Sequence, residues 1–314
     1  MADTPKYYIK GNLSEKQIEA DVAAYMGWCT PPYEDNPFRL LDLNEQLTGA
    51  DKLFDRGVAI YLQFKKSSGL KSVSLVKPSR RRGRSPLEDI REFRSCHDLD
   101  SDPTLFFQLR AKAKTAPDLQ HNILLGYERP LWSRAIYVAP LLLDKEDYHR
   151  ALFESTNRFM LYPFYYRVRE VIQQRHWVSH FGAIPFLREH ISIAPHERVA
   201  DHNHFYAYSE TGVDISWHSP DVISRDPSRL SDFTIKLFRD ALENPDSMLS
   251  LEALAKQTAE IGMAYGFPDA TFAENEAPLH FLQRHSRWLR ETYGIRQLIL
   301  LGNSSYLADL RHGL

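Results

Sequence analysis

Three polar residues with little sequence between them could share one divalent cation: Asp51, Gln63 and Lys65. Carboxylate and amide oxygens are hard ligands that suit Mg²⁺, which usually keeps several of its waters. A lysine beside them can position or deprotonate one of these waters, or stabilise a developing negative charge. Such a group predicts metal-assisted hydrolysis of a phosphodiester. One more carboxylate is expected, and the candidates are Glu45, Glu19 and Glu15.

A strand must position these side chains, and the segment from Val58 to Phe64 alternates as a strand does. Every second residue of the segment is a large apolar one, which predicts a face that packs on a core. Gln63 and Lys65 fall on the opposite face, and because they are two residues apart their side chains are neighbours. The segment therefore predicts a strand with one core face and one face that carries the chemistry.

Asp51 joins this second face in only one pairing register. The tripeptide Asp55-Arg56-Gly57 is typical of a hairpin loop. With a three-residue loop, Asp51 lies opposite Tyr61 and diagonal to Gln63, at about 7–8 Å between backbones, so that two side chains can reach a shared ion. With a two-residue loop, Asp51 falls on the core face and the site is lost. The hairpin register is therefore the condition for the predicted site.

The order Glu45, Gly49-Ala50-Asp51, hairpin, Gln63-Phe64-Lys65 resembles the PD-(D/E)xK nuclease superfamily. The resemblance is to the variant with Gln at the second acidic position, as in Mrr-like restriction endonucleases. Two later segments, LQHNILLGYE and RAIYVAP, are similar in order to the crossover helix and the closing strand of that superfamily. The resemblance covers roughly residues 14 to 140 and depends on short motifs.

The resemblance implies that Asp51 and Gln63 bind the metal, that Lys65 acts on the nucleophilic water, and that Glu45 or Glu19 completes the metal shell. The ion would be Mg²⁺, with Mn²⁺ as a substitute, and Gln63 in place of a carboxylate leaves the site with less negative charge. The implied activity is that of an endonuclease, acting on DNA in preference to RNA, in restriction or anti-phage defence.

A run of positive charge follows the predicted site. The chain has 39 Lys+Arg against 41 Asp+Glu, for a net charge of -2, yet the segment from Arg56 to Leu87 contains no acidic residue. Such a segment favours contacts with phosphates, and binding through it weakens as salt rises. The alternative is a solvated loop without a ligand. The predicted nucleic-acid contacts are Lys66, Lys71, Lys77, Arg80, Arg81, Arg82 and Arg84.

The expected helices and strands are those of an α/β protein. Residues 1–145 are predicted to form the nuclease-like core, a central mixed sheet flanked by helices, and residues 146–314 an accessory α/β region. Helical patterns cover 14–26, 87–95, 117–127, 145–159, 162–175, 231–242, 250–265 and 278–293. Strands are expected at 58–64, 72–76, 134–139 and 296–301, with a hairpin over 205–217 around Glu210-Thr211-Gly212.

Composition excludes several classes of protein. The chain has 43% hydrophobic and 25% charged residues, which is ordinary globular usage, and only two cysteines, Cys29 and Cys96, so no disulfide framework is expected. Without a long apolar segment or a signal-peptide core, we expect a cytoplasmic protein with no membrane partner. No Walker loop or dinucleotide-binding glycine pattern occurs. A homo-oligomer or a regulatory partner stays possible.

Two other interpretations stay open. A nuclease fold without activity could serve as a nucleic-acid-binding module. A histidine-based metallohydrolase could use the histidine-rich segment 176–218, because neutral imidazoles bind zinc. Gln120 and His121, on the helix expected at 117–127, either face the predicted site or form a surface pair. The histidines of the second alternative are His176, His180, His196, His202, His204 and His218.

Overall fold

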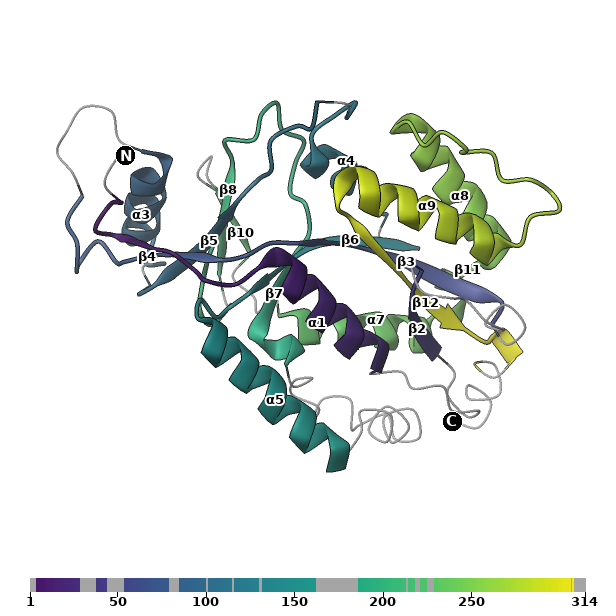
Figure 1. The fold of residues 1–314 in the computed structure, drawn as a ribbon, viewed down its shortest axis with the longest axis horizontal. Coiled ribbons are helices and arrows are strands. Elements are labelled where there is room, and N and C mark those ends of the chain that lie inside the picture. Colours follow the sequence, from purple (N-terminus) through teal and green to yellow (C-terminus); the bar gives the residue numbers. More distant parts are fainter. Residues whose placement is uncertain are drawn as a thin grey trace.

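The computed structural model is an α/β structure organised around two sheets (Figure 1). One contains a parallel pair among antiparallel ones and is called the mixed sheet. The other has antiparallel pairs throughout its described strands and is called the antiparallel sheet. The structure describes residues 4–28, 38–43, 54–78, 85–99, 101–114, 116–129, 132–161, 186–212, 214–217, 221–224, 229–305 and 307.

The mixed sheet has the strand order β2-β12-β3-β6-β7, and the short β11 pairs with the start of β3. β12 is antiparallel to both β2 and β3, whereas β3 is parallel to β6. A strand from the C-terminal end of the described chain thus lies between two strands from its first quarter. The bounds are β2 Phe38–Asp42, β3 Arg56–Phe64, β6 Ser133–Pro140, β7 His190–Ile193, β11 Leu249–Ser250 and β12 Arg296–Gly302.

The antiparallel sheet has the order β1-β4-β5-β8-β9-β10. Strands from both sides of residue 145 occur in each sheet, so the boundary expected there does not coincide with a division between the sheets. The turn between β8 and β9 contains Gly212 at a φ of 69°, which suits glycine. The bounds are β1 Tyr8–Ile9, β4 Ser68–Leu70, β5 Thr104–Gln108, β8 Phe205–Ser209, β9 Ile215–Trp217 and β10 Asp221–Ser224.

Helices cover both faces of the mixed sheet. In the view of Figure 1, α4, α8 and α9 lie above it, and α1, α5 and α7 lie below it. None of the described helices is both long enough and apolar enough to cross a membrane. The bounds are α1 Glu15–Trp28, α3 Pro86–Cys96, α4 Gln120–Gly126, α5 Lys145–Leu161, α7 Leu230–Glu243, α8 Leu251–Ala264 and α9 Pro278–Tyr293, with short 3₁₀ turns at Leu187–Glu189 and Pro245–Ser247.

β3 is buried on both faces, because it lies between β12 and β6 and under both helix layers. Its predicted core face packs against α1 and α7, with Ile60 and Leu62 in one cluster with Val22. The opposite face, which was expected to be polar, is buried too, with Tyr61 in a cluster that includes Leu254 of α8 and Leu289 of α9. Central strands covered by helices on both sides are commonly buried in this way.

Two buried arginines fasten α3 to the antiparallel sheet. Arg94 donates to the backbone oxygens of Leu99 at 2.9 Å and Ala207 at 3.3 Å, and it forms an ion pair with Asp214. Arg91 donates to the backbone oxygen of Lys71 at 2.8 Å. Because a buried guanidinium requires partners for its donors, these bonds fix α3 and the segment that follows β4.

The predicted hairpin at Asp55-Arg56-Gly57 is wrong. Arg56 and Gly57 belong to β3 itself and pair with residues of β12. Tyr61, the expected partner of Asp51, pairs with Gln297 of β12 on one side and Ala135 of β6 on the other. Both edges of β3 are therefore occupied at Tyr61, and β2, the preceding strand among the described residues, lies on the far side of β12.

The other expected elements are mostly confirmed. Seven predicted helices correspond to α1, α3, α4, α5, α7, α8 and α9, although α4 begins at Gln120, and the hairpin at 205–217 is the β8–β9 pair. The strand predicted at 72–76 is wrong, because that segment turns and the strand lies earlier, in β4. The helix predicted at 162–175 lies outside the described residues.

Among the described residues, three histidines are buried in the core, and burial lowers the pKa of each to about 4. His190 bonds the backbone oxygen of Phe186 through Nδ1 at 3.0 Å. His285 donates from Nδ1 to Gln297 Oε1 and accepts from the Tyr127 hydroxyl, both at 2.8 Å. His121, described below, is the third. All three are neutral in the folded protein at pH 7.

We expect the protein to lose stability between pH 7 and pH 5. An unfolded histidine takes up a proton near pH 6.5, whereas each of these folded histidines does so only near pH 4. The free energy of unfolding is therefore highest above pH 6.5 and falls as the pH is lowered, by about 2 kcal/mol per histidine at pH 5. Urea unfolding at the two pH values measures this loss. The variant His190→Asn should show a smaller loss, and an equal free energy of unfolding at both pH values would contradict the prediction.

Candidate active site

Lys65 is a buried lysine at the end of the central strand. Its N–H donates to the backbone oxygen of Val138 at 2.9 Å, which extends the pairing with β6 one residue beyond β3. The residue is 4% exposed. Its ammonium group donates to Gln120 Oε1 at 3.4 Å and lies 5.9 Å from the centre of the Tyr137 ring. A positive charge is thus held against a neutral amide and an aromatic face.

This environment lowers the pKa of Lys65 to about 8. Burial is the largest cause, because it penalises the charged form. The negative charge of Glu15 opposes the effect, and the positive charge of Arg110 adds to it. A lysine with a pKa near 8 is partly neutral at physiological pH, so its amine can accept a proton from a reacting water.

Gln63 lies on the same face of the strand, two residues before Lys65, and is 5% exposed. Its Nε2 donates to the backbone oxygen of Phe64 at 3.2 Å. Its Oε1 is buried and has no hydrogen-bond partner among the described residues. An unsatisfied buried acceptor costs about 1–3 kcal/mol, and a water or a ligand at this oxygen would remove that cost. A hard cation, or a water bound to such a cation, is a suitable partner for this amide oxygen.

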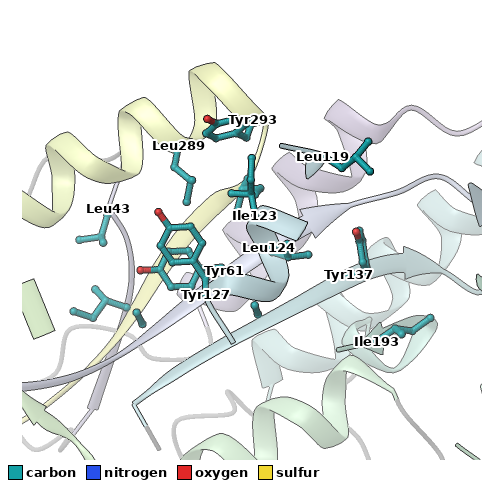
Figure 2. Packing of buried hydrophobic residues seen from close by; sticks show 14 of the residues in the cluster. Leu43, Tyr61, Leu119, Ile123, Leu124, Tyr127, Tyr137, Ile193, Leu289 and Tyr293 are labelled. Carbon is teal, nitrogen blue, oxygen red and sulfur yellow. The ribbon is translucent and has the colours of Figure 1, made fainter. Parts of the chain in front are cut away.

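Gln120 connects the lysine to the C-terminal part of the chain. It is the first residue of α4 and is buried, and its Nε2 donates to the backbone oxygen of Tyr293 at the end of α9. Gly294 follows in the left-handed region at a φ of 65°, which ends the helix before β12. Figure 2 shows Tyr293 in the buried cluster that also contains Ile123 of α4 and Tyr61 of β3. The ammonium group after β3 is therefore bound by the first residue of α4, which is in turn held by the last residue of α9.

His121 fixes the start of α4 from its other side. Its Nε2 lies 2.6 Å from the backbone oxygen of Glu197, which can only accept, so Nε2 carries the proton. Nδ1 then accepts from the Tyr137 hydroxyl at 2.9 Å. Tyr137 is also the residue of β6 that lies opposite Gln63. Gln120 and His121 thus face the site and its supports, which decides between the two placements that the sequence left open.

Glu19 is not placed to share an ion with Gln63, contrary to the expectation. Its carboxylate contacts Arg290 at 3.1 Å and Arg296 at 3.2 Å. Arg296 lies opposite Leu62 in the β3–β12 pair, and Leu62 projects to the α1 side of the sheet, whereas Gln63 projects to the other side. Glu15, one helical turn earlier, is the carboxylate of α1 whose charge acts on Lys65.

Asp51 and Glu45 lie outside the described residues. The pairing that was to bring Asp51 beside Gln63 does not exist, because β12 occupies that edge of β3. Their metal-binding role therefore stays a prediction that depends on the order of the motifs alone.

The predicted nucleic-acid contacts are separated by the fold. Lys66 is exposed directly after the site. Lys71 and Lys77 are exposed in the segment that Arg91 ties to α3, and α3 lies at the opposite end of the molecule from α8 and α9 (Figure 1). The remaining members, Arg80, Arg81, Arg82 and Arg84, lie outside the described residues.

The histidine-rich segment is only partly described. The His204 ring stacks on Trp217 at 5.1 Å between centroids, and the His121 ring also stacks on Trp217, at 5.7 Å. Among the described residues, no three His, Cys, Asp or Glu side chains are grouped so as to hold a metal ion. His176, His180 and His218 lie outside the described residues, whereas His196 and His202 lie within them.

No protein-family model, no curated protein and no solved structure was found to match the chain. The site is therefore judged on its own geometry. It combines a lysine of lowered pKa, an unsatisfied amide oxygen on the same strand face and a carboxylate whose charge reaches the lysine. Such groups can move a proton and offer a ligand to a hard cation.

Replacing Lys65 by methionine should stabilise the protein. Below pH 8 both folded and unfolded Lys65 are charged, so the full penalty for a pKa of about 8 instead of 10.5 applies, which is about 3 kcal/mol. The penalty shrinks as pH rises toward 10.5, because the folded lysine is then neutral. Urea unfolding of wild type and Lys65→Met at pH 7 and pH 10 tests this. A variant less stable than wild type at pH 7 would show that the lysine serves stability.

Proposed function

We propose that the chain is a divalent-metal-dependent phosphodiesterase that cleaves nucleic acid, DNA in preference to RNA, as a restriction or anti-phage endonuclease. The observation that carries the proposal is the pair on one face of β3: a buried lysine of lowered pKa and, two residues before it, a buried amide oxygen without a partner. A protein that needed this strand only for its core would gain by having apolar residues at both positions.

The surrounding elements support a restriction-endonuclease-like core made by α1, β3, α4 and β6. β3 and β6 are parallel neighbours, and α4 directly precedes β6 along the chain. Gln63 and Lys65 lie at the C-terminal end of β3, where the start of α4 and the charge of Glu15 approach them. This is the order of helix, strand, helix and strand that the sequence resemblance implies.

Lys65 would act through its neutral amine. It takes a proton from the attacking water at Nζ, and the resulting ammonium group then stabilises the negative charge that develops on the phosphoryl oxygens. Gln120 holds Nζ in place through Oε1 and is itself held by the Tyr293 backbone. Gln63 Oε1, with carboxylates from Asp51 and Glu45, would hold Mg²⁺ or Mn²⁺, which supplies a polarised water and charge stabilisation.

The direct test is cleavage of plasmid DNA and of a labelled RNA with Mg²⁺ or Mn²⁺. Lys65→Met should lose at least about a hundredfold in rate, since general-base catalysis contributes about 10²–10⁴. Lys256→Met is the matched control, because Lys256 is an exposed lysine on α8 paired with Glu252, and it should cleave as wild type does. Equal rates for Lys65→Met and wild type, or binding of DNA without cleavage in either metal, would contradict the proposal.

The rate of cleavage should rise with pH if Lys65 is the base. For a pKa of about 8, the neutral fraction rises about tenfold between pH 7 and pH 9, and the rate under single-turnover conditions should follow it. The residual activity of Lys65→Met should lack this rise. A rate that falls over the same interval would show that the lysine acts in its charged form.

A further inference from the structure

A second positive charge stands beside the site but takes no part in holding it. Arg110 follows β5, and the preceding residue, Leu109, is anchored by a bond of its N–H to the backbone oxygen of His204 at 3.0 Å. A Cβ placed on Gly294 would lie 3.6 Å from the Arg110 guanidinium and 3.7 Å from Gln120 Nε2. Arg110 therefore lies at the turn that holds Gln120, and its charge acts on Lys65.

Within the part of the chain that the structure describes, the Arg110 guanidinium has no carboxylate or hydrogen-bond acceptor as a partner, and the residue is exposed. Some other arginines are paired: the exposed Arg198 with Asp118, and the half-buried Arg284 with Glu276. The nearest acid that follows in sequence, Asp118, is already bound by Arg198 and by Asn122 at 2.8 Å.

The segment around Arg110 has one sign of charge. Residues 103 to 117 contain no Asp or Glu, and their charged residues are Arg110, Lys112 and Lys114, all exposed. Lys112 Nζ donates to the backbone oxygen of Pro117 at 2.9 Å, so this loop folds back toward the start of α4. An unpaired arginine next to a buried lysine is repulsive unless an anion joins them, and a phosphodiester matches the guanidinium fork.

We propose that Arg110 binds a phosphate adjoining the scissile one, and that Lys112 and Lys114 extend this contact along the same strand of the substrate. The inference rests on the proposed function, because it assigns Arg110 to the phosphate next to the one on which Lys65 would act. Nucleic acid is bound along the loop at 110–114, beside α4 and the α9–β12 turn.

The test is binding without cleavage, so that affinity is measured apart from chemistry. A fluorescent DNA duplex is titrated with wild type, Arg110→Gln and Arg110→Lys in EDTA at several salt concentrations. Arg110→Gln should bind about tenfold more weakly, with a salt slope smaller by about one, and Arg110→Lys should recover part of the affinity. The control is Arg129→Gln, an exposed arginine that precedes β6 at its far end, which should bind as wild type does.

Two results would overturn the inference while leaving the phosphodiesterase intact. One is wild-type affinity and salt slope for Arg110→Gln in a protein that cleaves DNA. The other is displacement of the duplex by inorganic phosphate as effectively as by an oligonucleotide, which would assign a single free anion to Arg110. A wild-type protein that neither binds nor cleaves DNA or RNA would overturn the proposed function and this inference together. If the first of these results comes with a shifted pH profile of cleavage, Arg110 acts on Lys65 and not on the substrate.

Discussion

The site depends on keeping one ammonium group out of water without giving it a carboxylate in direct contact. Lys65 has an amide oxygen at 3.4 Å and an aromatic ring beyond it, while the acid that acts on it, Glu15, is exposed. These contacts stabilise the charged form of Lys65 less than a buried carboxylate partner would. Burial therefore lowers the pKa of Lys65. A closed ion pair would instead fix the charge and remove the lysine from proton transfer at neutral pH.

The sheet order is what makes this environment rigid. β3 has backbone partners on both sides, β12 from Arg56 to Leu62 and β6 from Ala59 to Phe64, which fixes its register and so the orientation of Gln63 and Lys65. The turn between α9 and β12 then supplies the backbone oxygen that orients Gln120. The C-terminal part of the chain is therefore structurally necessary to the site, and it both completes the sheet and holds the residue that contacts the lysine.

Local patterns predicted the local structure well. The alternation of residues 58–64 predicted β3 and the shared face of Gln63 and Lys65, and helical periodicity predicted α1, α3, α7, α8 and α9. The pairing of strands could not be predicted in the same way. No local pattern shows that the strand beginning at Arg296 pairs with the edge of β3 to which the predicted hairpin assigned the segment with Asp51. The hairpin failed because Gly57 suits the close contact of a central strand, where an added Cβ would lie 2.9 Å from Ile299, as well as it suits a turn.

The partners of individual side chains could not be predicted from the sequence either. Glu15 and Glu19 are one helical turn apart and look equivalent, yet two arginines from α9 and β12 take up Glu19. Arg110 could have been found from its surroundings, since the segment 103 to 117 contains basic but no acidic residues, as does the basic run that was identified. The role of Tyr293 could not have been found in this way, because a contact through a backbone oxygen does not depend on the type of residue.

The pKa of Lys65 is the most direct measure of this arrangement. Protein carrying ¹³C at the lysine ε-carbons can be titrated by NMR, with the Lys65 resonance assigned by its absence in Lys65→Met. A midpoint of about 8 is predicted for Lys65, well below the ordinary lysine value of 10.5. A midpoint near 10.5 would mean that the ammonium group is solvated, and the proposed proton transfer would lose its basis.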